Sequence, residues 1–238
     1  MLFFFKETPI EIIAYVKDVN NSIKEFSPII PARECFPSWW KNTPSSSFNW
    51  DNLNPKNTVK SCPGIVQTLT SGFILPLWSD LALEYNDEQY RFQFSDNNTL
   101  LSAHPDEQAP GFCEDYWKIK IHSPWIFSTP VRLLYTSPFY HNTSSSLPFI
   151  VPPAIIPPVK ELCGSNVFLF AKKQKELNKV LLKNGTPLLH IIPLTDKKVT
   201  IKCETLSESE YFKRESIVCT KSFFNNRGLK NLFRDKNK

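Results

Sequence analysis

The chain has 238 residues, a formal net charge of +5, and 41% hydrophobic and 21% charged residues, which are values typical of a globular protein with a sizeable core. Twenty prolines argue against long helices, and only six glycines argue against the glycine-rich loops that hold phosphate groups in nucleotide-binding enzymes. Neither a GxGxxG nor a Walker-type motif occurs in the chain.

The six cysteines are dispersed, and no two of them form a CxxC pair. Zinc sites and thioredoxin-like motifs need such close pairs, so neither is expected. Residues 1–6 hold only four apolar side chains after Met1 before a lysine, which is too short for the core of a signal peptide. No run of 18 apolar residues occurs either. We therefore expect reduced, buried thiols in a protein that is neither secreted by a signal peptide nor membrane-spanning.

The N-terminal quarter of the chain predicts little regular structure after its first strands. Residues 2–16 alternate in a way that favours two short strands, whereas residues 20–58 are rich in Pro, Ser and Asn. We interpret this second stretch as a long irregular segment that tryptophan side chains anchor on the core. Residues 61–72 predict a short helix, with Ser61 as its N-cap and Gly72 just after its end.

From residue 73 onwards the sequence favours strands separated by proline- and asparagine-rich turns. The expected strands are residues 73–78, 81–85, 90–94, 116–121, 125–127, 131–135, 167–170, 188–194 and 199–203, with an extended segment over 149–159. The second and third form a hairpin, and Pro124 and Pro130 divide the central group. These patterns predict one mainly β domain over residues 1–206, resembling a β-sandwich or jelly roll.

A basic helical appendage is expected over residues 207–238. Ser207 and Glu210 have the spacing of a capping box, which opens a helix. Residues 213–238 contain eight Lys or Arg against two acidic residues, so this segment carries +6 and the remaining chain −1. Clustered cations attract phosphate groups, so the candidates for binding nucleic acid or another polyanion are Lys213, Arg214, Lys221, Arg227, Lys230 and Arg234. The alternative is a solvated helix whose phenylalanines pack on the domain.

One candidate metal site combines His104 and Asp106 with the distant His190. Two histidines and one carboxylate form the facial triad of non-haem Fe(II) oxygenases, and the order of these residues resembles that of the 2-oxoglutarate-dependent family. Lys198 would then meet a carboxylate of the cosubstrate, although that family usually has an arginine there. The alternative is a surface turn at residues 104–106 that holds no metal or other cofactor.

Several short sequence segments resemble those of an uncharacterised family of proteins from tailed phages, marine ones especially. They occur in consistent order: Lys60-Ser61-Cys62-Pro63, His104 with Gln108, Pro124-Trp125, Thr129-Pro130, and Gly185-x-Pro187 with Ile192-Pro193. The chain departs from the family at Val131-Arg132-Leu133, where a Gly-Tyr-Ser is usual. In that family the recurring pair is His with Gln, which counts against His104 and Asp106 as iron ligands.

The resemblance implies an all-β body and a phage context, in the host cytoplasm or in the virion. The candidates for ligand binding are His104, Gln108, Trp125 and Arg132. The function that we expect first is a non-enzymatic, virion-associated or accessory protein that acts through its surface on protein partners, on the phage particle or on copies of itself. An Fe(II) oxygenase and a nucleic-acid-binding protein are the alternatives.

Overall fold

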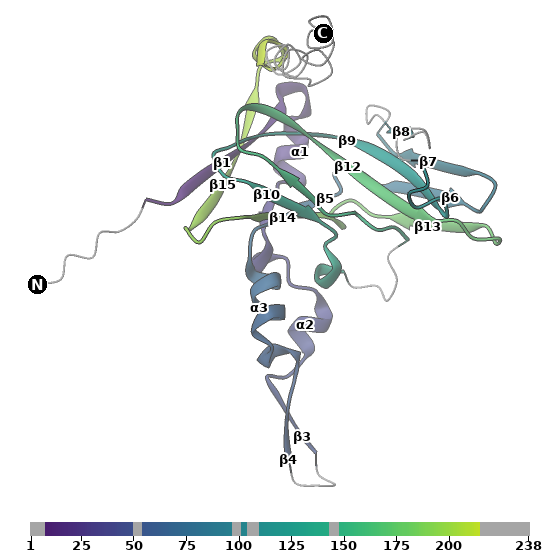
Figure 1. The fold of residues 1–238 in the computed structure, drawn as a ribbon. Coiled ribbons are helices and arrows are strands. Elements are labelled where there is room, and N and C mark those ends of the chain that lie inside the picture. The colour runs from purple at the N-terminus through teal and green to yellow at the C-terminus, as the bar shows by residue number, and fades with distance from the viewer. Residues whose placement is uncertain (1–7, 50–53, 97–100, 104–109, 143–147, 215–238) are drawn as a thin grey trace, which may run out of the picture.

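The computed structural model describes residues 8–49, 54–96, 101–103, 110–142 and 148–214, and these residues form mainly β-structure (Figure 1). The prediction of a mainly β fold is confirmed. The strands form two five-stranded sheets, one three-stranded sheet and one separate two-stranded ribbon. Within the described ranges, no helix is both long and apolar enough to cross a membrane.

The first five-stranded sheet is built around a long strand rich in β-branched and aromatic residues, which favour extended backbone. Its order is β12-β9-β1-β15, and β8 also pairs with β9. β1 and β15 run parallel, whereas the other pairs in this sheet are antiparallel. The strands are β1 (Ile10–Lys17), β8 (Leu101–Ala103), β9 (Tyr116–Thr129), β12 (Val159–Lys172) and β15 (Val199–Leu206).

The second five-stranded sheet has the order β11-β10-β14-β5-β2, with antiparallel pairs throughout. Its strands are β2 (Ile30–Pro31), β5 (Phe73–Pro76), β10 (Leu133–Thr136), β11 (Ala154–Ile156) and β14 (Pro187–Pro193). The three-stranded sheet joins β13 (Asn178–Leu182), β6 (Leu81–Tyr85) and β7 (Tyr90–Phe94) in the order β13-β6-β7. The hairpin predicted from residues 81–94 is therefore confirmed.

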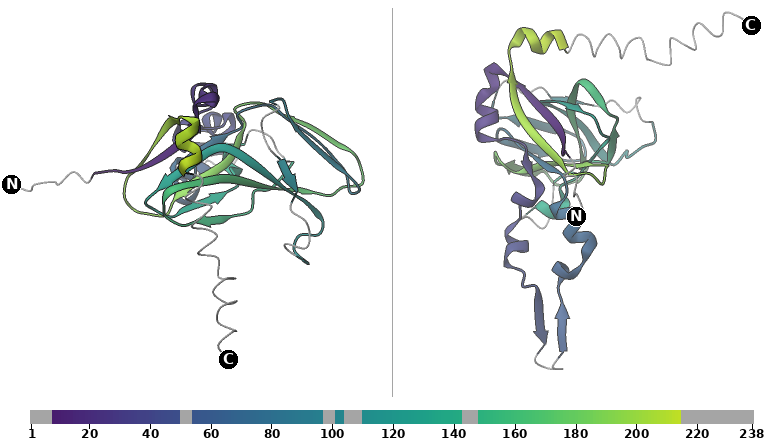
Figure 2. Two further views of the ribbon diagram at one scale, coloured as in Figure 1. Left: turned by 90° about the horizontal axis from the view of Figure 1, so that it is seen from above. Right: turned by 90° about the vertical axis from the view of Figure 1, so that its left-hand side faces the viewer.

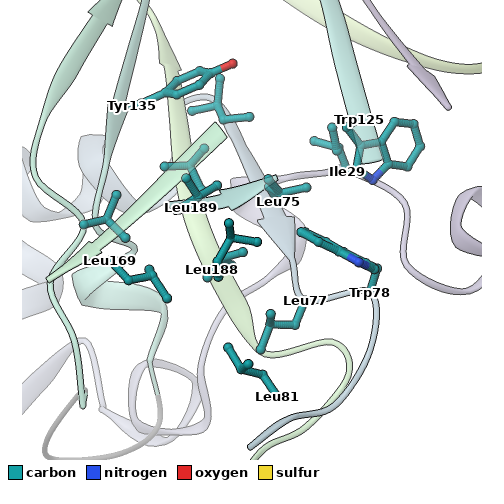
Figure 3. Packing of buried hydrophobic residues seen from close by; sticks show 14 of the residues in the cluster. Ile29, Leu75, Leu77, Trp78, Leu81, Trp125, Tyr135, Leu169, Leu188 and Leu189 are labelled. Atoms are coloured by element: carbon teal, nitrogen blue, oxygen red, sulfur yellow. The ribbon is translucent and has the colours of Figure 1, made fainter. Parts of the chain in front are cut away.

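All three of these sheets contribute side chains to one hydrophobic core (Figure 3). The alternation of strand β6 turns Leu81, Leu83 and Tyr85 inward, while its intervening residues are more exposed. Trp125 of the first sheet and Leu75 of the second lie in the same cluster. Complete burial of one such aliphatic or aromatic side chain stabilises a fold by about 1.5–3 kcal/mol.

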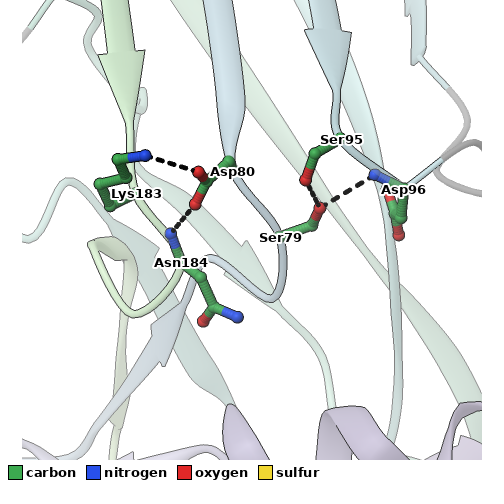
Figure 4. A network of polar contacts seen from close by, with 6 residues as sticks. All are labelled: Ser79, Asp80, Ser95, Asp96, Lys183 and Asn184. Carbon is green, nitrogen blue, oxygen red and sulfur yellow. Dashed lines mark hydrogen bonds and ion pairs between the residues drawn. The ribbon is translucent and has the colours of Figure 1, made fainter.

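A polar network fastens the turn between β13 and β14 to the segment that precedes β6 (Figure 4). The Lys183 Nζ lies 2.9 Å from Asp80 Oδ2, and the backbone N–H of Asn184 donates to Asp80 Oδ1 at 2.8 Å. These two donors hold the pKa of the Asp80 carboxyl below its ordinary value, with the lysine contributing most. Beside them, Ser79 Oγ accepts from the backbone N–H of Asp96 at 3.1 Å.

A stalk projects from the body of the molecule, as Figures 1 and 2 show from two sides. We use this name for residues 38–70, which comprise α2 (Ser38–Asn42), β3 (Ser46–Asn49), β4 (Asn54–Asn57), the 3₁₀ turn η3 (Val59–Ser61) and α3 (Pro63–Thr70). The β3–β4 hairpin forms the far end of the stalk, and α2 and α3 lie between it and the sheets. At the opposite end of the body lie η1 (Asp18–Asn20) and α1 (Asn21–Phe26).

The stalk corrects the expectation of an irregular segment over residues 20–58. Trp40 is buried and packs edge-on against Trp39 at 5.7 Å between ring centroids, but neither ring belongs to the core clusters of the described residues, so the predicted anchoring on the core is not seen. The predicted helix over residues 61–72 is present as α3, although its N-cap is Cys62 and not Ser61. Gly72 follows its end with φ of 73°.

The C-terminal helix begins where the capping box predicts. Residues 208–214 are helical, the backbone N–H of Glu210 donates to Ser207 Oγ at 3.3 Å, and Ser207 Oγ donates back to Glu210 Oε2 at 3.0 Å. Tyr211 of this helix packs on a second small cluster of Tyr15, Ile126 and Leu206. The predicted continuation of the helix after residue 214 lies outside the described residues.

Candidate functional site

The root of the stalk joins four elements around a glycine. Helix α3 ends there against η2 (Ala32–Glu34), η5 (Phe139–His141) and β14. The backbone N–H of Ala32 donates to the Gly72 carbonyl at 2.9 Å. A Cβ at Gly72 would lie 2.1 Å from the carbonyl oxygen of Ile191, so only glycine allows the chain to pass this close to β14.

Two buried histidines, His141 and His190, hold the end of helix α3. Their ring centroids lie 5.0 Å apart with an interplanar angle of 73°. His141 Nε2 lies 3.3 Å from the Leu69 carbonyl, and His190 Nε2 lies 2.8 Å from the Ser71 carbonyl. Because a carbonyl only accepts, both Nε2 atoms carry the proton and donate. The pair thus satisfies two carbonyls that a helix end leaves without intrahelical partners.

Burial keeps both rings neutral at neutral pH. It lowers the pKa of His141 to about 4, and the neighbouring His190 lowers it further, while the Leu69 and Ala32 carbonyls oppose the shift. Burial also lowers the pKa of His190, against the opposing hydrogen bond to Ser71. Nδ1 of His141 is buried without a hydrogen-bond partner in the described part of the chain. At pH 7 the two neutral rings therefore act as hydrogen-bond donors that support the structure, and neither is a protonated acid.

On the solvent side of Ser71 lies a groove of about 480 Å³, which we call the cationic groove. It runs between the edge strand β2 of one sheet and the edge strand β15 of the other, and the end of α3 closes one side. Its polar lining consists of Arg33, Gln67, Thr70, Ser71, Thr195, Lys197, Lys198 and Thr200, and its apolar lining includes Ile29, Ile192, Pro193 and Val199. No acidic residue is among the described side chains that line it.

The predicted metal site is only partly covered by the structure. His104, Asp106 and Gln108 lie outside the described residues. His190 lies on β14 as expected, but its Nε2 donates to Ser71 and its ring neighbour is His141. Among the described residues, no group of three or more His, Cys, Asp or Glu side chains has an arrangement that could hold a metal ion. The Fe(II) triad stays a prediction.

The other two ligand-binding candidates lie apart from the cationic groove. Trp125 has no exposed surface and packs in the core, so its role in this conformation is structural (Figure 3). Arg132 is exposed between β9 and β10, and its backbone carbonyl accepts from the N–H of Leu194 at 2.9 Å. The structure does not bring these two side chains together at one site.

Of the predicted polyanion-binding residues, the structure describes Lys213 and Arg214. The Arg214 guanidinium lies 5.2 Å from the ring centroid of Tyr15, which places it against the outer face of β1. Lys221, Arg227, Lys230 and Arg234 lie outside the described residues. Nucleic-acid binding by this segment stays a prediction.

The sequence reasoning missed His141, Arg33 and Lys197. The pair Lys197-Lys198 between two predicted strands indicates a basic turn, but a role was predicted for Lys198 alone. Arg33 and His141 become neighbours of this region only through long-range packing at the stalk root. A comparison of the chain with models of protein families, with curated proteins and with solved structures found no match.

Proposed function

We propose that the protein is a non-enzymatic interaction protein, virion-associated or accessory in a phage-type system, and that the stalk hairpin is the part that binds a protein partner. The observation that carries this proposal is the hairpin itself. Strands β3 and β4 form a separate sheet of two strands with four residue pairs, and they project away from the body. A two-stranded hairpin of this length is at best marginally stable in water. A docked partner would supply the stabilising contacts that the body does not provide.

The composition of the hairpin supports a protein partner. Residues 46–57 carry one acidic and one basic side chain, together with Phe48 and Trp50 among serines and asparagines. Aromatic residues in a weakly charged surrounding are typical of the centres of protein interfaces, whereas nucleic acid favours clustered cations. Either a second copy of this chain or another component of a particle fits this chemistry. The proposal includes a sandwich-like arrangement of the two five-stranded sheets as a rigid support.

The test removes the hairpin and leaves the stalk root intact. Thr58 Oγ1 donates to the Ser45 carbonyl at 3.2 Å, so a Gly-Ser pair can replace residues 46–57 without separating the flanking segments. The full chain and the shortened chain are compared by light scattering for self-association, and by their recovery in particles purified after expression during infection. We expect the shortened chain to lose the assembly that the full chain shows in one of these two measurements.

A matched control uses an exposed aromatic at the other end of the molecule. Phe26 is 78% exposed and belongs to α1, which lies at the end of the body opposite the stalk (Figure 1), so Phe26→Ser should leave assembly unchanged. The double variant Phe48→Ser/Trp50→Ser should reproduce the effect of removing the hairpin. Equal assembly of the full chain, the double variant and the shortened chain would rule out the hairpin as the binding element.

A further inference from the structure

The cationic groove holds three positive side chains that the folded body does not neutralise. Arg33, Lys197 and Lys198 are exposed, and none of them forms an ion pair or a side-chain hydrogen bond with another described residue. All three line the same hollow, and none of the residues that line it in the described part of the chain is acidic. Like charges gathered in one groove repel each other, and the groove focuses their potential on an anion that enters it.

The rest of the lining limits the kind of anion. Thr195 and Gln67 offer hydroxyl and amide groups that can donate hydrogen bonds to phosphate oxygens, and Ile29, Ile192 and Pro193 form an apolar wall. A volume of about 480 Å³ lies within the range of small-molecule sites. A nucleic-acid strand would need a longer basic surface than a single groove with three cations.

We propose that the cationic groove binds a small organic phosphate, with Arg33, Lys197 and Lys198 around the phosphate oxygens and the apolar wall against the organic body. Arg33 is suited to a bidentate contact, since its guanidinium fork matches two oxygens of one phosphate. The two lysines come from the turn between β14 and β15, and Arg33 comes from η2. The ligand therefore bridges the edges of the two five-stranded sheets. This inference does not depend on the function of the hairpin.

The test measures binding of phenyl phosphate to the full chain by isothermal titration calorimetry at low salt. We expect Lys197→Gln/Lys198→Gln and Arg33→Gln each to weaken binding by about tenfold or more, because each variant removes charge-assisted hydrogen bonds to the phosphate. Lys197→Arg/Lys198→Arg should retain binding. The charge-matched control is Lys172→Gln/Lys175→Gln, which removes two exposed lysines elsewhere and should change affinity by less than about twofold.

Further probes separate the alternatives. Inorganic phosphate carries a charge similar to that of phenyl phosphate without an apolar body, so it should bind more weakly because it makes no contact with the apolar wall. Citrate and a single-stranded oligonucleotide test a tricarboxylate and a polymer. Equal affinity of the unsubstituted chain and the Lys197→Gln/Lys198→Gln variant for phenyl phosphate would overturn the proposal, as would the absence of binding. Tighter binding of citrate or of the oligonucleotide than of either phosphate would also overturn it.

Discussion

At the scale of single residues, substitutions at three glycines distinguish the cost of left-handed backbone strain from the cost of overpacking when a methyl group is added. Gly72 has φ of 73° and no room for a Cβ, Gly185 has φ of 84° and open space, and Gly64 lies in α3 with open space. We expect Gly64→Ala to be neutral or to stabilise slightly, because alanine favours the helix. Gly185→Ala should cost about 1 kcal/mol for the left-handed backbone, and Gly72→Ala about 2–4 kcal/mol, because the overpacking adds to this.

Urea unfolding of the three alanine variants measures these differences as shifts in the free energy of unfolding. The order of the three values is the informative result, since all three changes add the same atoms. If Gly72→Ala and Gly185→Ala lose equal stability, the close approach of Gly72 to Ile191 does not matter to the fold.

The buried histidine pair makes stability depend on pH. His141 has a pKa of about 4 in the folded chain, below the ordinary value of 6.5 that the unfolded chain regains. The unfolded state therefore binds more protons between these two values, and the free energy of unfolding falls as the pH drops from about 7 towards 4. For His141 alone the loss reaches about 2 kcal/mol at pH 5. The pKa of His190 is also lowered, so its loss has the same sign.

The measurement is urea unfolding at several pH values between 7.5 and 5, on the unsubstituted chain and on His141→Gln. The amide can still donate to Leu69 but does not titrate, so the pH dependence should become shallower. His122→Gln is the comparison. Burial also lowers the pKa of His122, which lies on β9 with its Nε2 3.1 Å from Ser102 Oγ, so this variant should reduce the pH dependence by less than His141→Gln does. A His141→Gln variant with an unchanged slope would show that other groups cause the acid sensitivity.

At the scale of elements, the sequence predicts the strands that alternate and misses those that depend on distant partners. Strand β6 and the helix α3 are recognisable because hydrophobic spacing and local end signals specify them. Strand β13 (Asn178–Leu182) is short and follows a lysine-rich stretch, and it was not predicted; in the structure it pairs with β6. The strands of the β3–β4 hairpin were not predicted either, because they lie in a polar, proline-containing stretch.

Strand β9 shows that a proline can also lead to the prediction of a break where the strand continues. Pro124 suggests a break, yet β9 continues through it, so the predicted division into residues 116–121 and 125–127 is wrong. The ladder with β12 instead shifts its register between Gly164 and Asn166, opposite this proline. There, Ser123 Oγ accepts from the backbone N–H of Trp125 at 3.1 Å, and Ser165 Oγ donates to its carbonyl. Side-chain hydroxyls thus replace the missing ladder bonds.

The candidate sites also depend on residues that are distant in the sequence. The histidine pair and the cationic groove combine residues that are more than 100 positions apart, such as Arg33 with Lys197 and His190 with Ser71. No local motif indicates such a combination, because the polar groups that meet at each site come from segments that are far apart in the chain. Only the Lys197-Lys198 pair was visible from sequence, as a basic turn.

At the scale of the whole molecule, the division between body and hairpin predicts how the protein unfolds. The buried core lies in the three larger sheets, and the contacts of α3 with the body end at the stalk root. The described backbone of β3 and β4 pairs only within its own sheet. A chain in which Gly-Ser replaces residues 46–57 should therefore keep the free energy of unfolding of the full chain to within about 0.5 kcal/mol, as changes outside the packed structure generally do.

Urea unfolding followed by tryptophan fluorescence measures this, because Trp125 and Trp78 report on the core in both chains. The control removes support at the stalk root: Leu69 is fully buried in α3, and Leu69→Ala should destabilise either chain by about 2–5 kcal/mol. A large loss of stability on removal of the hairpin alone would mean that it packs on the body and is not free to bind a partner. Unchanged stability together with lost assembly would assign the hairpin to intermolecular contact, because the body would then be intact while the interaction is gone.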